Sequence, residues 1–80
     1  MAQLSTPADL EGYMLERLIH VVGSPLALAA LAAAKKLAEI DQIACVRDFI
    51  VVSKVLAKQD GYIGIVGDLI ALEAERWGTP

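Results

Sequence analysis

His20 and Cys45 are the residues best suited to chemistry in this 80-residue chain, which contains one histidine and one cysteine. Glu16 precedes His20 by four residues, so in a helix the two share a face and could bind a metal ion if another chain added ligands. A metal site needs three or four ligands, and no other cluster of His, Cys or carboxylate supports one. A solvated Glu–His pair is the favoured interpretation, and we expect no metal and no cofactor.

Cys45 is the candidate nucleophile, and it would need a nearby base. His20 has the chain's one imidazole. We expect Cys45 to lie on the inward face of a helix among apolar residues, where a thiol is inert. The chain is therefore not expected to be an enzyme; an accessory enzyme subunit that uses Glu16, His20 and Cys45 remains an alternative.

Arg47, Lys54 and Lys58 form a basic stripe along one side of an expected helix. The chain as a whole is acidic, with a net charge of -3 and a pI near 4.9, and no aromatic residues are interleaved with the stripe. Both features argue against a nucleic-acid partner, which needs clustered cations and stacking side chains. A solvated helix face is favoured, and a helical DNA-binding or regulatory module is kept as an alternative.

The composition is unusually apolar for a small chain, since 56% of its residues are hydrophobic. A chain of this size buries only about 60% of the surface that its unfolded form exposes, so some apolar side chains should cover a partner. We expect no membrane span, because the run 18–34 is broken at Gly23–Pro25 and the run 43–57 contains charges. One cysteine allows no internal disulfide, and we expect a single domain over 1–80, with no signal peptide, in the cytoplasm.

The elements expected in the first half are two helices. Thr6 is expected to cap the first, with Pro7 at its first position and an end at Gly23. Its inward face is Leu10, Met14, Leu18 and Val21. The second, 26–40, is rich in alanine, the best helix former, and we expect it at the centre of the fold.

The second half is expected to form two more helices. A helix over 43–58 would bury Cys45, Val46, Phe49, Val52, Ser53 and Leu56. A helix over 62–77 would have a ridge of small residues for close contact: Gly64, Gly67, Ala71 and Ala74. The alternative is a β-hairpin over 49–66, because 49–52 has high strand propensity and Asp60-Gly61 is a turn signal.

Together these patterns predict an all-α fold, a compact bundle of about four short helices, with helices plus a C-terminal β-hairpin as the alternative. The expected function is a small non-enzymatic module that binds another protein or itself through an apolar helical face. An inhibitor, an adaptor and an assembly subunit all fit this description, as does a phage-encoded antagonist of a host system such as an anti-CRISPR. The residues expected to bind the partner are Arg47, Val51, Lys54, Val55, Ile65, Leu72 and Trp77.

Overall fold

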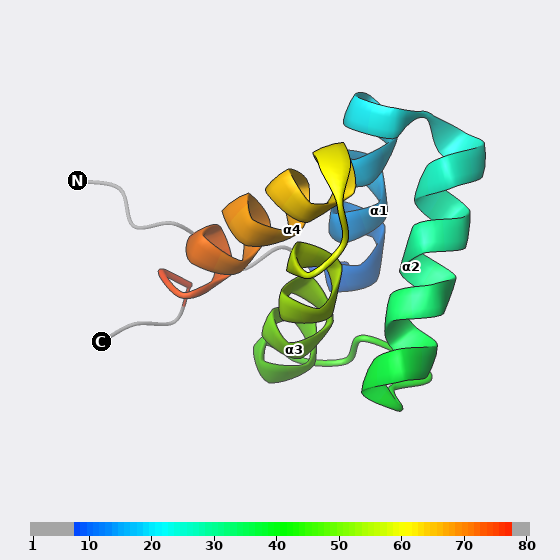
Figure 1. Ribbon diagram of the computed structural model, residues 1–80. Helices are drawn as coiled ribbons and strands as arrows, with labels where there is room; N and C mark the ends of the chain where they lie inside the picture. The colour runs from blue at the N-terminus through cyan, green and yellow to red at the C-terminus, as the bar shows by residue number, and fades with distance from the viewer. Residues whose placement is uncertain (1–7, 78–80) are drawn as a thin grey trace.

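Four helices make up the regular structure of residues 8–77, the part of the chain that the computed structural model describes. They are α1 (Leu10–Val22), α2 (Ser24–Ala38), α3 (Val46–Ala57) and α4 (Gly61–Ala74). The prediction of an all-α fold is confirmed. The alternative hairpin over 49–66 is wrong, because this segment forms α3, a short turn and the start of α4. Figure 1 shows α2 along one side of the molecule and α4 extending toward the other.

The corner between α1 and α2 consists of a single residue, Gly23. Its φ of 85° is a conformation that other residues rarely adopt, so the chain can turn there without an intervening loop. The N–H of Gly23 donates to the carbonyl of Ile19, and the carbonyl of Gly23 accepts from Ala27. One glycine therefore ends α1, as predicted, and also begins α2.

The start of α1 differs from the prediction. Helix α1 begins at Leu10, and the Asp9 side chain caps it by accepting a hydrogen bond of 2.9 Å from the N–H of Gly12. The predicted capping residue Thr6, with Pro7, lies outside the described residues. An aspartate has the same capping chemistry as a threonine, so the capping signal belongs to Asp9.

The core is formed mainly by large side chains from α1, α3 and α4. Met14, Leu18, Phe49, Leu56 and Ile70 are fully buried. Helix α2 supplies mostly alanines to this core, and it packs against α1 and α3 on one side of the molecule. The prediction that α2 lies at the centre is wrong, because its larger side chains Leu26, Leu28 and Leu37 point to solvent.

A cluster of three aromatic rings closes the end of the core near the C-terminal end of α4. The ring centroids of Phe49 and Trp77 lie 4.9 Å apart, and those of Tyr13 and Trp77 lie 5.5 Å apart. Both pairs are tilted or edge-to-face, which are the arrangements that aromatic rings prefer. Trp77 therefore attaches the segment after α4 to α1 and α3.

The connection 39–45 is held in place by Glu11 of α1. The Glu11 carboxylate accepts a hydrogen bond of 2.9 Å from Nζ of Lys35 and one of 3.1 Å from the N–H of Ile43. Ile43 lies outside any helix and is buried in the core, and α3 begins at Val46, later than predicted. Cys45 becomes the residue before α3 and is exposed, which corrects the prediction that it lies inward.

Helices α3 and α4 approach each other closely across two glycines of α4. A methyl group at Gly67 would lie 2.5 Å from the backbone nitrogen of Ala57 and 2.8 Å from Cβ of Leu56. One at Gly64 would overlap the carbonyl of Gln59. The predicted small-residue ridge is confirmed, since Ala71 and Ala74 are buried on the same side of α4.

None of the helices in residues 8–77 has the length and apolar composition needed to cross a membrane.

We predict that Gly67→Ala destabilises the fold, although alanine is the better helix former. The added methyl group would meet the backbone of α3, which cannot rotate away, and overpacking of this kind costs about 1–3 kcal/mol. The free energy of unfolding from urea titration measures the effect. Asp68→Ala is the control, because it introduces alanine at an exposed position of the same helix. An equal decrease in the free energy of unfolding of the two variants would show that the close contact at Gly67 does not control stability.

The stability of the fold should also depend on the ionisation of Glu11. Hydrogen bonds from Lys35 and from the N–H of Ile43 lower the pKa of Glu11 below its ordinary value of 4.5. A lowered folded-state pKa contributes stability above the unfolded value, and this contribution is lost as the pH falls through the folded value.

Glu11→Gln should therefore lower the free energy of unfolding near neutral pH by at most about 1 kcal/mol, since the pair is partly exposed. The difference from the native protein should shrink when the pH is lowered from neutrality to below 4.5, because protonation of Glu11 weakens the hydrogen bonds that it accepts from Lys35 and Ile43. Urea titrations at the two pH values measure it. Glu16→Gln, at an exposed position of the same helix, should show no such pattern; a similar pattern there would rule out a specific role for Glu11.

Candidate functional site

His20 and Cys45, the residues best suited to chemistry, belong to different elements: His20 lies in the last turn of α1, and Cys45 directly precedes α3. Nδ1 of His20 donates a hydrogen bond of 2.8 Å to the backbone carbonyl of Glu16, so the contact is made within α1 and not with the Glu16 carboxylate. Cys45 lies at the start of α3. Within residues 8–77, no group of three or more His, Cys, Asp or Glu side chains is placed to hold a metal ion.

The seven predicted contact residues are divided between two helices and the core. Arg47, Val51 and Lys54 are exposed on the outer face of α3, and Val55 beside them is half-buried. Ile65 and Leu72 are exposed on α4. Because α3 and α4 pack together through their inner faces, these outer faces point away from each other and do not join into one patch.

Trp77 is the predicted contact residue that the structure places in the core. Its side chain is only 5% exposed and packs against Phe49 and Tyr13. The sequence could not show this, because the turn after α4 folds the ring back under the helix end. Trp77 therefore has no surface to offer to a partner in this fold.

The outer face of α4 carries a row of large exposed apolar side chains. Tyr62, Ile65, Leu69 and Leu72 are 70%, 56%, 53% and 56% exposed. Their spacing of three, four and three residues places them along one side of the helix, as in the contact seam of a coiled coil. We call these four residues the α4 stripe.

Tyr62 and Leu69 are the members of the α4 stripe that the sequence interpretation missed. In a helix Tyr62 also aligns with Val66 and Ile70, which are buried. The signal that could have found it is the spacing of the four residues, which repeats the alternation of three and four seen in heptads. The opposite face of α4 is apolar as well, so periodicity alone could not decide which face points outward.

A hydrogen-bonded network of α1 and α4 borders the stripe. The Tyr13 hydroxyl donates to Oε2 of Glu73 over 2.6 Å, and Nη1 of Arg17 donates to Oε1 of Glu73 over 2.8 Å. Nη1 of Arg17 also donates to the Tyr13 hydroxyl over 2.8 Å. Burial, and then the hydrogen bond to Glu73, raises the pKa of Tyr13 above its ordinary value of 10.0. This network fixes the polar edge of the stripe.

A shallow depression lies between this edge and the end of the stripe. It has a volume of about 430 Å³ and is lined by Arg17, Leu69, Leu72, Glu73 and Arg76. Its floor is thus partly aliphatic and its rim carries two guanidinium groups. Such a surface suits a side chain that is apolar in its body and polar at its tip, such as a tyrosine.

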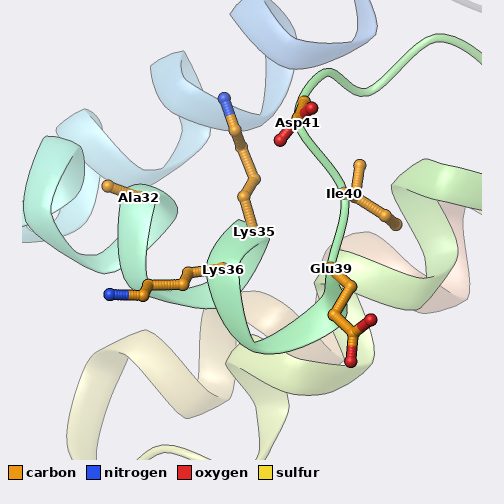
Figure 2. A pocket seen from close by; sticks show the side chains of 6 residues that line it. All are labelled: Ala32, Lys35, Lys36, Glu39, Ile40 and Asp41. Atoms are coloured by element: carbon orange, nitrogen blue, oxygen red, sulfur yellow. The ribbon is translucent and has the colours of Figure 1, made fainter.

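A second depression, of about 330 Å³, lies at the end of α2. Figure 2 shows that the amino groups of Lys35 and Lys36 point in different directions and do not converge on one point. Lys35 is already paired with Glu11, and the carboxylates of Glu39 and Asp41 also line this depression. Binding sites for small molecules have a few convergent polar groups, so this depression lacks their main feature.

Comparison with known proteins gives no match: no protein-family model, no curated protein and no solved structure matches this chain. The candidate site therefore rests on the exposure and spacing of the α4 stripe.

We predict that Tyr13 titrates above its ordinary range. Tyr62→Phe removes the exposed tyrosine, so that the absorbance of tyrosinate reports the ionisation of Tyr13 alone. Glu73→Gln is then introduced in this background. The pKa of Tyr13 should fall with this change but stay raised, because burial is the larger cause. A raised folded-state pKa means that the fold favours the neutral phenol. The contribution of Tyr13 to the free energy of unfolding should therefore be fully present below pH 10.0 and be lost as the pH rises through the folded-state pKa.

Asp41→Asn is the control for this titration, because it removes an exposed carboxylate of the 39–45 connection. It should leave the Tyr13 titration unchanged. A Tyr13 pKa at its ordinary value, or an equal effect of Asp41→Asn, would contradict the network.

Proposed function

We propose that this chain is a small protein-interaction module that performs no chemistry of its own. It acts by burying the α4 stripe against another protein chain. An inhibitor, an adaptor and an assembly subunit would all use such a surface. The single cysteine, exposed at the start of α3, is compatible with a reducing compartment such as the cytoplasm.

The observation that carries this proposal is that α4 is apolar on both sides. Its inner side, which includes Gly67, Ile70 and Ala74, is buried in the fold, while the α4 stripe is more than half exposed. A helix that is apolar all round is normally covered on all sides. Contiguous exposed apolar surface of this kind marks interaction sites in folded proteins.

The energetics suit an interface of moderate strength. Full burial of a Leu or Ile side chain contributes about 1.5–3 kcal/mol, so completing the burial of four half-exposed side chains contributes roughly 3–6 kcal/mol. Association itself costs an estimated 4–15 kcal/mol. The stripe therefore needs an equally apolar partner surface, or further contacts at its rim, to bind measurably.

Leu69→Asp is expected to abolish binding, because it places a charge in the middle of the stripe. Leu69 is 53% exposed, so the variant should still fold, which circular dichroism checks. Affinity capture from the native lysate, quantified for the two baits by mass spectrometry, measures the loss. A partner should be retained at least about tenfold better by the native chain than by Leu69→Asp.

Leu28→Asp is the matched control, since Leu28 is 55% exposed but lies on α2. It introduces the same charge at the same degree of exposure. Partners that need the α4 stripe should be retained by Leu28→Asp. If the two variants lose the same partners, or if neither loses any, the α4 stripe is not the binding surface.

A further inference from the structure

The spacing of the α4 stripe makes it complementary to itself. The intervals between Tyr62, Ile65, Leu69 and Leu72 are three, four and three residues, which read the same in both directions. When two such helices lie antiparallel about a two-fold axis at the level of Gly67, Ile65 lies opposite Leu69 and Tyr62 opposite Leu72. A two-fold interface requires this kind of self-complementary surface.

We infer that the occupant of the α4 stripe is a second copy of this chain, with its α4 antiparallel to the first. This inference rests on the proposed function and specifies the partner. The four apolar layers match the alternation of contacts in an antiparallel coiled coil. The two bodies of the fold then lie on opposite sides of the paired helices.

Tyr62 supplies the projecting side chain of this interface, and the other copy supplies the hollow. Tyr62 is 70% exposed, whereas the other three aromatic residues of the chain are packed together. In the antiparallel arrangement it lies at the level of Leu72 of the second copy, beside the 430 Å³ depression. Its ring can contact Leu69 and Leu72 there, with the guanidinium groups of Arg17 and Arg76 nearby for cation–π contact.

Charged residues flank the α4 stripe at both ends. Lys58 and Asp60 precede the helix, and Glu75 and Arg76 follow it; all four are exposed. About an axis at the level of Gly67, the segment 58–60 of each copy lies at the level of 74–76 of the other, so Asp60 can reach Arg76 and Lys58 can reach Glu75. Lys58 also lies level with Arg76, so these charges rim the apolar layers without setting the direction of pairing.

Asp68 opposes self-association. It lies beside the stripe, one residue from the level of the axis, so the carboxylates of the two copies approach each other. Repulsion between the two carboxylates weakens self-association, whereas the same carboxylate would attract a basic partner. Removal of the charge should therefore tighten self-association and weaken the binding of a basic partner.

Sedimentation equilibrium of the purified chain over a range of concentrations tests the inference. The native chain should show a monomer–dimer equilibrium. Leu69→Asp should weaken it by roughly 30-fold or more, because each dimer buries two of the new charges. Leu28→Asp should leave it unchanged. A dimer that survives Leu69→Asp but is lost in Leu28→Asp would overturn the inference in favour of the α2 face.

Disulfide cross-linking tests the direction of pairing. In a Cys45→Ser background, an equimolar mixture of I65C and L69C should form a mixed disulfide-linked dimer, because these positions lie opposite each other only in the antiparallel arrangement. D68N should tighten the dimer. Cross-linking of I65C to itself in place of the mixed dimer, or weakening by D68N, would overturn the antiparallel dimer.

A native chain that stays monomeric at every concentration up to its solubility limit would also overturn the inference. If that monomer still captures a partner that Leu69→Asp loses, the proposed function stands with a different occupant. If it captures none, both proposals fail.

Discussion

The close contact between α3 and α4 is the constraint on which the rest of the structure depends. Gly64 and Gly67 have no side chain to separate the two helices, and a methyl group at either position would meet the backbone of the α3–α4 hairpin. The inner face of α4 must therefore be made mostly of small residues. The large apolar residues at positions 62, 65, 69 and 72 are consequently directed outward, so the exposed stripe follows from how the helix is packed.

The limited number of large side chains reinforces this arrangement. Phe49, Trp77 and Tyr13 form the aromatic cluster, and Tyr62 is the one aromatic residue outside it. In a fold of this size there is too little interior for every apolar group, so some must remain on the surface. These groups follow the outer sides of α2 and α4, and on α4 they are larger and regularly spaced.

Much of the fold could be predicted from local sequence signals. Gly23 marked the α1–α2 corner, and the inward set of α3 from Phe49 to Leu56 followed from helical periodicity. The positions of Cys45 and Ile43 could not be predicted in the same way, because they depend on Glu11, more than thirty residues earlier in the chain. Its carboxylate accepts hydrogen bonds from Lys35 of α2 and from the N–H of Ile43, and this long-range contact holds the connection so that α3 starts after it.

The candidate site was predictable only in part, for a physical reason specific to α4. A helix with apolar residues all round gives no amphipathic signal, so its outer face cannot be identified from polarity. Residue size carries the information instead: neighbouring helices approach most closely over the smallest side chains, so the ridge of Gly64, Gly67, Ala71 and Ala74 faces inward. The larger residues opposite the ridge then form the surface. The same reasoning identifies the outer face of any short apolar helix that has one side of glycine and alanine.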